Sequence, residues 1–303
     1  MAATPSGTDA RTRTGPAAGR LPLLLAPALG VVLLLFGGGL VLGLVQALGH
    51  IPGAGLGRLS PEHFTRVLTD PDFFQSFWLT LYIAGVSTAV AAGLSVPAAL
   101  VLHESGKRSR GIHFLFQIPL TVPHLVIAVA VLFLLAPAGL LARAAVALGV
   151  IQGPADFPLL VNDSAAIGII AAYVWKEIPF ITLMVLAALH HSGRDLLDVG
   201  RTLKAGPWQR FRYITLPIIF PALGSASLIV FAYTFGAFEV PFLLGRTYPT
   251  TLPVWAYRHY SDIDLLARPE GIATGLVIAL VVAATVVLAQ ALTRAARRRG
   301  IVL

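Results

Sequence analysis

Six long runs of apolar residues dominate this sequence of 303 residues. A helix needs about 20 mostly apolar residues to cross the hydrocarbon core of a bilayer. Only 12% of the residues are charged, whereas soluble domains have about 25%. The sequence therefore predicts an all-α integral membrane protein with six transmembrane helices. Their approximate ranges are 21–49, 77–102, 114–137, 164–189, 218–244 and 270–293.

The basic residues are divided unequally between the two sets of connecting segments. Of the 22 Lys and Arg residues, 15 lie in four segments: 1–20, 107–110, 190–217 and 294–299. The positive-inside rule places these segments in the cytosol, so we expect both termini to be cytosolic. The same residues flank membrane helices and face anionic lipid, so the net charge of +8 does not require a nucleic-acid partner.

The chain begins with a polar stretch before its first apolar run. Residues 1–20 contain Pro, Gly and Arg and little that could form a core. This composition predicts a disordered basic cytosolic tail. The transmembrane domain is then expected to occupy 21–303. The apolar run over 21–49 is much longer than the roughly 7–15 apolar residues of a secretory signal, and so reads as a membrane helix.

A polar loop over 190–217 interrupts the apolar pattern between the fourth and fifth runs. Good helix formers predict a short helix over 196–204, which Gly206 ends. Pro207 then suits the first position of a second short helix. This loop is the longest polar interruption between the spans, and its residues define the main candidate site.

Aromatic residues stand on the second short helix of this loop. Trp208 and Phe211 are three residues apart and are expected to share one face. Basic residues, among them Arg212, lie elsewhere around the helix. Aromatic anchors with a basic rim suit a protein–protein interface. The alternative is a solvated basic connector that only follows the positive-inside rule.

An acidic residue in the loop, Asp198, precedes Ile214 and the pair Leu216-Pro217 at a fixed spacing. This register resembles the EAA loop of binding-protein-dependent ABC importer permeases. The family pattern is E-A-A, three residues, G, nine residues, I, one residue and L-P. The resemblance covers about residues 60–295 and implies the type I ABC importer permease fold, with a core at about 73–293.

In that family the loop is a coupling helix that inserts into a groove of an ATPase subunit. The resemblance implies two ABC ATPase subunits, a second and non-identical permease subunit, and an extracytoplasmic solute-binding protein as partners. It also implies a prokaryotic cytoplasmic membrane. The residues implied in the coupling loop are Asp198, Gly200, Lys204, Gly206, Pro207, Trp208, Phe211, Arg212, Ile214, Leu216 and Pro217.

The loop departs from the family pattern at four positions, the first of which is Asp198, one methylene shorter than the family Glu. Val199 and Gly200 replace two Ala residues, and Lys204 replaces the family Gly. A non-Gly residue in the left-handed conformation costs about 1 kcal/mol. We therefore expect the turn at Gly206 rather than at Lys204.

The sequence lacks a phosphate-binding loop. Such a loop needs G-x-x-x-x-G-K-[ST], and the Gly106-Lys107 pair is followed by Arg108. ATP and Mg²⁺ are therefore expected on the partner ATPases and no cofactor on this chain, which is not predicted to be an enzyme. A stand-alone secondary transporter or channel is the alternative. It often shows two related halves, which are not evident here. A membrane enzyme would need a clustered catalytic group.

Three charged residues fall inside the apolar runs: Lys176, Glu177 and Glu239. A central charge costs about 2.5–3.5 kcal/mol on insertion scales, so each should face the protein interior or a wet cavity. One interpretation is that they line the translocation pathway or its gate. The other is a structural ion pair between Lys176 and Glu239. Adjacent helix residues point about 100° apart, so Lys176 and Glu177 are not expected to face one point.

Histidines and an aromatic residue complete the candidate set. His124 follows Pro123 and is expected to be a packed, hydrogen-bonded histidine near a kink, with a gate role as the alternative. Phe238 joins the candidate gate residues. The adjacent His190 and His191 lack carboxylate or Cys support, so no metal site is predicted.

The segment 235–255 suggests a substrate class. It contains F-G-A-F-E-V-P-F-L-L-G followed by T-L-P-V-W. It looks similar to permeases of the polyamine, opine, phosphonate and iron group. The resemblance implies a polyamine-like solute (spermidine or putrescine) or 2-aminoethylphosphonate. The alternative is that Gly236 and Pro241 merely break the helix while the aromatic residues anchor it at the outer interface.

Overall fold

The computed structural model describes residues 21–55, 57–105, 110–192 and 199–298. The predicted tail over 1–20 lies outside these ranges. Within them the chain is helical, and no strand occurs. In chain order the α-helices are α1 (Leu21–Val32), α2 (Gly38–Ala47), α3 (Glu62–Thr69), α4 (Pro71–Ser105), α5 (Arg110–Thr121), α6 (His124–Leu135), α7 (Leu140–Ala147), α8 (Ile167–Ser192), α10 (Pro207–Arg210), α11 (Leu216–Gly236), α12 (Glu239–Leu244), α13 (Leu252–Tyr260) and α14 (Arg268–Arg298).

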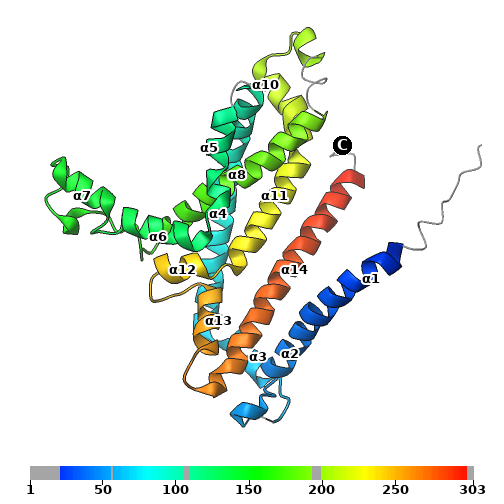
Figure 1. Ribbon diagram of the computed structural model, residues 1–303, viewed down its shortest axis with the longest axis vertical. Helices are drawn as coiled ribbons and strands as arrows, with labels where there is room; N and C mark the ends of the chain where they lie inside the picture. Colours follow the sequence, from blue (N-terminus) through cyan, green and yellow to red (C-terminus); the bar gives the residue numbers. More distant parts are fainter. Residues whose placement is uncertain (1–20, 56, 106–109, 193–198, 299–303) are drawn as a thin grey trace, which may run out of the picture.

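Six helical segments are long and apolar enough to cross a membrane, which confirms the predicted number of spans. The long helices α4, α8 and α11 pack against one another. Helix α14 packs against α11, and α2 packs against α14 along the edge (Figure 1). The six segments are Leu25–Ala47, Pro71–Glu104, His124–Ala147, Ile167–His190, Pro207–Gly236 and Leu265–Ala291.

The third apolar run does not form the continuous helix predicted over 114–137. Helix α5 ends at Thr121, and α6 begins at His124. Proline has no N–H to donate, and it disfavours the helical conformation in the residue before it, here Val122. Pro123 therefore breaks the run and leaves the last carbonyls of α5 without partners inside the helix.

The fifth run is also broken, so its predicted bounds of 218–244 are wrong. Helix α11 ends at Gly236, Ala237 is extended, and Glu239 is the first residue of α12. Pro241 is the third residue of α12. It is tolerated there because the first-turn N–H groups of a helix have no partner within it. The helix therefore breaks after Gly236, as one sequence alternative expected, whereas Pro241 lies within the next helix.

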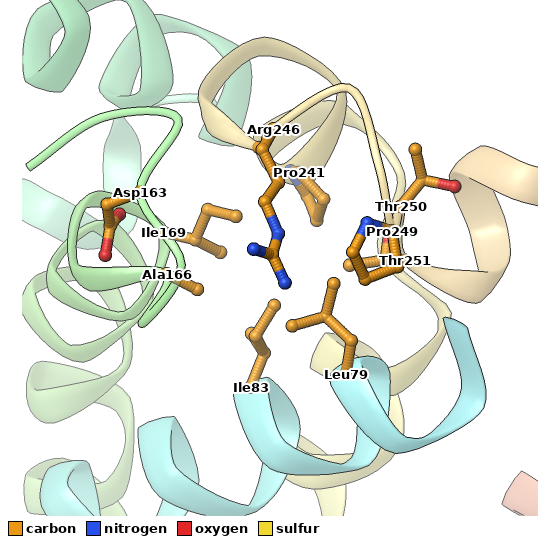
Figure 2. A pocket seen from close by; sticks show the side chains of 11 residues that line it. Leu79, Ile83, Asp163, Ala166, Ile169, Pro241, Arg246, Pro249, Thr250 and Thr251 are labelled. Carbon is orange, nitrogen blue, oxygen red and sulfur yellow. The ribbon is translucent and has the colours of Figure 1, made fainter. Parts of the chain in front are cut away.

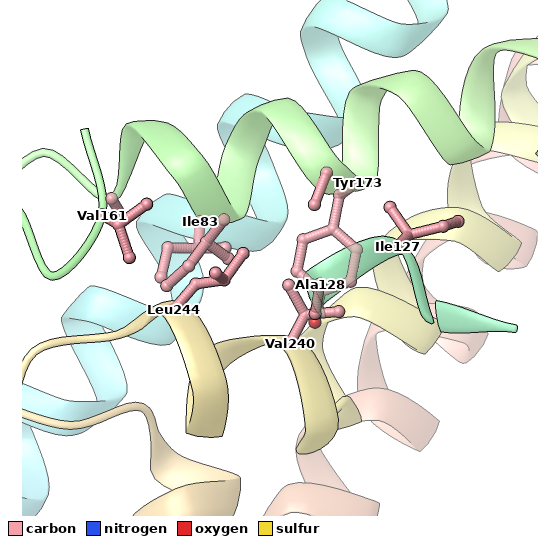
Figure 3. Close-up of a cluster of buried hydrophobic side chains, with 10 residues drawn as sticks. Ile83, Ile127, Ala128, Val161, Tyr173, Val240 and Leu244 are labelled. Carbon is pink, nitrogen blue, oxygen red and sulfur yellow. The ribbon is translucent and has the colours of Figure 1, made fainter. Parts of the chain in front are cut away.

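A buried cluster holds the two short helices that follow these breaks. Ile83 of α4, Ile127 of α6, Tyr173 of α8 and Val240 of α12 pack in one group (Figure 3). Lipid is as apolar as these side chains, so close packing rather than removal from water stabilises the group. The cluster fixes α6 and α12 side by side against α4 and α8.

Small and hydroxyl residues allow the central helices to approach closely. Ala91 and Ala99 of α4 are fully buried against α8 and α11. The Ser95 hydroxyl of α4 donates to the carbonyl of Ala91 at 2.6 Å and to that of Ile178 in α8 at 3.0 Å. Small residues and interhelical hydrogen bonds are the usual means of association in lipid. The α4–α8 pair therefore forms the rigid centre of the molecule.

Candidate functional site

The loop predicted to contact an ATPase is continuous with the fifth membrane helix. Residues 199–202 are helical, α10 follows, and the π-helical turn η5 (Phe211–Thr215) leads directly into α11. Pro207 is the first residue of α10, as predicted. Asp198 lies outside the described residues. No extended residue therefore separates α10 from α11.

The turn between the two short helices is made at Lys204, which corrects the expectation of a turn at Gly206. Lys204 has φ +54°, in the left-handed region. Its N–H donates to the carbonyl of Arg201, and the N–H of Ala205 donates to that of Gly200, both at 3.0 Å. These two bonds form a Schellman motif, which satisfies the end of the first helix. They offset the cost of a side chain in this conformation.

Gly206 does not make the predicted turn but begins the second short helix. It is extended, with φ −64° and ψ 163°, and it is the N-cap of α10. Its backbone N–H donates to Oε1 of Gln209 at 2.9 Å. This contact satisfies a backbone donor that α10 itself leaves unpaired.

The surface of this segment presents an aromatic pair. The rings of Trp208 and Phe211 lie 5.6 Å apart, and Trp208 is 71% exposed. Arg212 is exposed beside them. The predicted shared face is therefore confirmed, and it points away from the helices. Of the remaining predicted residues, Pro207 and Pro217 are exposed, whereas Leu216 is half-buried.

Gly200 explains how the two short helices approach each other. A Cβ at this position would lie 2.7 Å from Cδ1 of Ile214, a half-buried residue of η5. Real Cβ atoms essentially never come so close to a neighbouring carbon. Gly200 therefore permits the contact with Ile214 that joins the first helix to the base of α11.

A second group of candidate residues surrounds the break between α5 and α6. Lys176 of α8 is 7% exposed, and its Nζ donates to three backbone carbonyls that the break sets free. The acceptors are the oxygens of Pro119 at 2.7 Å, Leu120 at 3.0 Å and Val122 at 2.6 Å. A cation at the C-terminal end of a helix also complements the helix dipole. Lys176 thus caps α5 from the neighbouring helix.

Glu177 is the counterpart of Lys176 on the other side of the break. It is 8% exposed, and its Oε1 lies 3.2 Å from Nε2 of His124, the first residue of α6. An acidic group near the N-terminal end of a helix complements the dipole there. The packed, hydrogen-bonded histidine predicted at a kink is confirmed.

The two adjacent charges contact different groups, as expected, and the alternative ion pair between Lys176 and Glu239 is not found among the described residues. Lys176 and Glu177 both reach the same break, because the long Lys side chain spans the distance to the α5 carbonyls while Glu177 contacts α6. Among the described residues, Lys176 forms no ion pair with Glu239. The ammonium group of Lys176 already donates its hydrogen bonds to the carbonyls that Pro123 leaves free.

Glu239 and Phe238 lie at the break between α11 and α12. Glu239 is exposed on this chain. The ring of Phe238 packs 4.8 Å from Phe242 and 4.6 Å from Tyr257. Since α12 packs against α6, the two breaks are neighbours. The group defined by His124, Glu177, Phe238 and Glu239 is called the double-break cluster below.

Sequence reasoning missed two tyrosines of this region. The ring of Tyr233 lies 4.6 Å from that of His124, and that of Tyr173 lies 6.4 Å from it. Both tyrosines interact electrostatically with Glu177 and Glu239. A polar hydroxyl inside an apolar run was the available signal. It did not point to these residues because tyrosine also occurs commonly in membrane-facing positions.

The order of the helices and the loop ahead of α11 can now be compared with known proteins. Residues 85–300 match the family described as "Binding-protein-dependent transport system inner membrane component". The chain belongs to this family. It is a multi-pass inner-membrane protein and the permease subunit of an ABC importer. The permease is not an enzyme, and ATP hydrolysis belongs to a separate subunit.

Relatives within the family transport different solutes. The chain is 27% identical over 203 residues to the molybdenum transport system permease protein ModB of Azotobacter vinelandii, covering 66% of this chain and 86% of the relative. It is 26% identical over 185 residues to the spermidine/putrescine transport system permease protein PotB of Haemophilus influenzae, covering 61% and 63%.

A solved structure shows the same fold. The chain superposes with a TM-score of 0.74 on a chain of a bacterial alginate ABC transporter in complex with an alginate pentasaccharide-bound periplasmic protein. The match covers 93% of this chain and 97% of the other, at 21% identity. The predicted type I importer permease fold is confirmed.

Proposed function

We propose that this permease forms half of an import pathway for a small cationic, polyamine-like solute. The observation that carries the proposal is the charge of the double-break cluster. It contains two carboxylates, Glu177 and Glu239, and the aromatic faces of Phe238 and Tyr233 lie close by. Carboxylates attract ammonium groups, and aromatic faces attract cations within about 6 Å.

The neighbouring Lys176 does not cancel this preference. Its ammonium group is buried and engaged by three carbonyls of the α5 end. Glu239 is exposed on the isolated chain, at a helix break of the kind that lines cavities in membrane proteins. The surface offered to a passing solute is therefore acidic and aromatic, which suits an amine better than an oxyanion such as molybdate.

The transporter we propose has this chain, a second and related permease subunit, two ABC ATPases and an extracytoplasmic binding protein. The distribution of Lys and Arg supports a cytosolic position for both termini and for the segment 199–217. The exposed Trp208 and Arg212, with the half-buried Phe211 between them in the chain, are the proposed ATPase contact. ATP binding moves α10, and α11 carries this movement to the double-break cluster, where access alternates between the two sides.

Uptake by the assembled transporter tests the substrate class. Proteoliposomes are supplied with ATP and radiolabelled putrescine, spermidine, 2-aminoethylphosphonate or molybdate. We expect putrescine or spermidine to be transported. The E239Q variant should lower the rate at subsaturating solute about tenfold, because an interaction with a charged group contributes about 1.5–3 kcal/mol. Import of molybdate without the amines contradicts the proposal.

The matched control for this experiment is Glu62→Gln. Glu62 is an exposed carboxylate paired with Arg66 at 2.6 Å on α3, away from both breaks. Its replacement should leave uptake unchanged. Equal uptake by wild type and E239Q would remove Glu239 from the pathway.

The absence of Cys from the sequence allows a direct test of the lining. A single Cys at position 238 or 239 should react with a water-soluble cationic thiol reagent, and the transported amine should slow the reaction. A Cys that replaces Trp78, 63% exposed on α4, serves as the comparison and should show no protection. Lack of substrate protection at both 238 and 239 argues against a pathway at the double break.

A further inference from the structure

A small cavity lies where the connection between α12 and α13 meets the ends of α4 and α8 (Figure 2). It is separate from the double-break cluster and from the segment 199–217, and has room for about one water molecule. Its walls are mostly apolar, and its polar groups come from the connection and from the turn before α8. The polar lining residues are Asp163, Arg246, Thr250 and Thr251.

The guanidinium of Arg246 points into the centre of this cavity, toward Leu79 and Ile83 of α4 (Figure 2). Its Nε is buried and has no hydrogen-bond partner. Among the described residues no carboxylate lies within ion-pair distance of Arg246. Arg246 as a whole is half-buried. Charges that lose part of their hydration are normally paired, because that loss must be offset by another interaction.

A second unsatisfied group lines the same cavity. Thr251 is 4% exposed, and its Oγ1 is buried without a partner. Its backbone carbonyl accepts from Trp255, so the hydroxyl is the group left over. A guanidinium and a hydroxyl are both donors that an anion can accept from. Because the Arg246 guanidinium and the Thr251 hydroxyl line the same small cavity, they indicate a ligand that accepts hydrogen bonds.

Asp163 also lines the cavity but is already engaged. Its Oδ2 accepts from the backbone N–H of Ala165 at 3.0 Å, and both oxygens accept from that of Ile167 at 3.0 Å. The carboxylate therefore caps the start of α8 and is directed away from Arg246 (Figure 2). The guanidinium is left without a counter-charge from its own chain at bonding distance.

We propose that this cavity is a binding site for a monovalent inorganic anion of the size of chloride. Arg246 supplies the positive charge, and the Thr251 hydroxyl supplies a further donor. Leu79, Ile83 and Ile169 form the dry wall that excludes bulk water. A tetrahedral oxyanion is too large, since the space accepts a single water-sized particle.

The bound anion would fasten the α12–α13 connection to the membrane helices. That connection is already attached to α4 by two contacts: the hydroxyl of Tyr248 donates to Asp72 at 2.7 Å, and the N–H of Leu252 donates to Oγ1 of Thr80 at 2.7 Å. An anion on Arg246 adds a third attachment. We therefore expect halide to stabilise the protein against unfolding.

The test measures thermal unfolding of the full-length permease in nanodiscs. Sodium bromide replaces sodium gluconate at constant ionic strength, so that screening does not change. The melting temperature of wild type should rise with bromide and then saturate. The R246Q variant should show no such rise. In gluconate it should melt at or above the wild-type temperature, because it removes a half-buried charge that has no partner among the described residues.

Two further variants complete the experiment. Arg258→Gln is the matched control, since Arg258 is an exposed neighbour that donates to the carbonyl of Thr247 at 3.0 Å; it should keep the bromide effect. Thr251→Val keeps the shape and should raise the half-saturating bromide concentration about tenfold. It also serves if R246Q does not fold. A bromide-independent wild type, or an R246Q that retains the saturable rise, overturns the proposal and leaves a water molecule in the cavity.

Discussion

At the scale of single residues, Lys204 shows how local strain is offset by hydrogen bonding. It adopts φ +54° where the family pattern has Gly, yet the two bonds of the Schellman motif form around it. The sequence indicated that a left-handed Lys204 is energetically unfavourable, but it did not show the two backbone hydrogen bonds that offset this cost. Gly206 offered less strain, but a turn there would have removed the N-cap of α10.

The strain at Lys204 predicts that Lys204→Gly stabilises the turn by about 1 kcal/mol. Hydrogen exchange of the Ala205 amide should slow about fivefold, because this N–H closes the motif. The K204A variant is the control. It keeps a Cβ in the left-handed region and should exchange like wild type. Identical exchange in K204G and wild type would show that the side chain carries no strain.

At the scale of elements, the sequence predicted the membrane spans but not the two helix breaks within them. Hydropathy located six spans, but it could not show that Pro123 and Gly236 divide two of them. Two adjacent residues of α8 satisfy the groups that the first break leaves free. Lys176 donates to the carbonyls at the end of α5, and Glu177 pairs with His124 at the start of α6. The partners are separated by more than 50 residues in sequence, so no local pattern could reveal them.

This arrangement predicts that Lys176→Met destabilises the permease. Three carbonyls near the α5 end would lose their common donor inside a low-dielectric environment. The expected loss is on the order of 3 kcal/mol, because each buried unsatisfied group costs about 1–3 kcal/mol. Thermal unfolding in detergent measures it as a lowered melting temperature.

The exposed Lys204 supplies the control for this variant. Lys204→Met removes the same type of side chain from the surface, and should leave the melting temperature unchanged. If K176M melts together with K204M, the three hydrogen bonds contribute nothing to stability.

At the scale of the whole molecule, one continuous helical element runs from Pro207 to Gly236 and ends beside the break where Phe238 and Glu239 lie. Helix α10, η5 and α11 follow one another without an extended residue, and α11 ends two residues before Phe238. A displacement at Trp208 therefore reaches the second break through α11 packed against α4 and α8. In the mechanism that we propose, this continuity carries movement from the ATPase contact to the translocation pathway.

The exposed Trp208 predicts that this residue contributes strongly to the binding of the ATPase subunit. Trp208→Ala should weaken binding of the ATPase subunit at least about 30-fold, since interface tryptophans often contribute 2 kcal/mol or more. Titration of the permease in nanodiscs with purified ATPase measures the change. Trp78→Ala is the control, because Trp78 is similarly exposed on α4. Unchanged affinity in W208A would place the ATPase contact elsewhere.

The sequence by itself determined the class of protein, the number of spans and the family, because apolar length, charge distribution and the register over 198–217 are properties of local sequence. It also predicted that Trp208 and Phe211 share a face and that His124 is hydrogen-bonded near a kink, whereas their roles in coupling and gating stay predictions. Only the tertiary structure decided the partners of Lys176 and Glu177, the position of Glu239 at a break, and the unpaired state of Arg246. These depend on which groups distant segments bring together, and in a low-dielectric interior such pairings decide where a charge can lie.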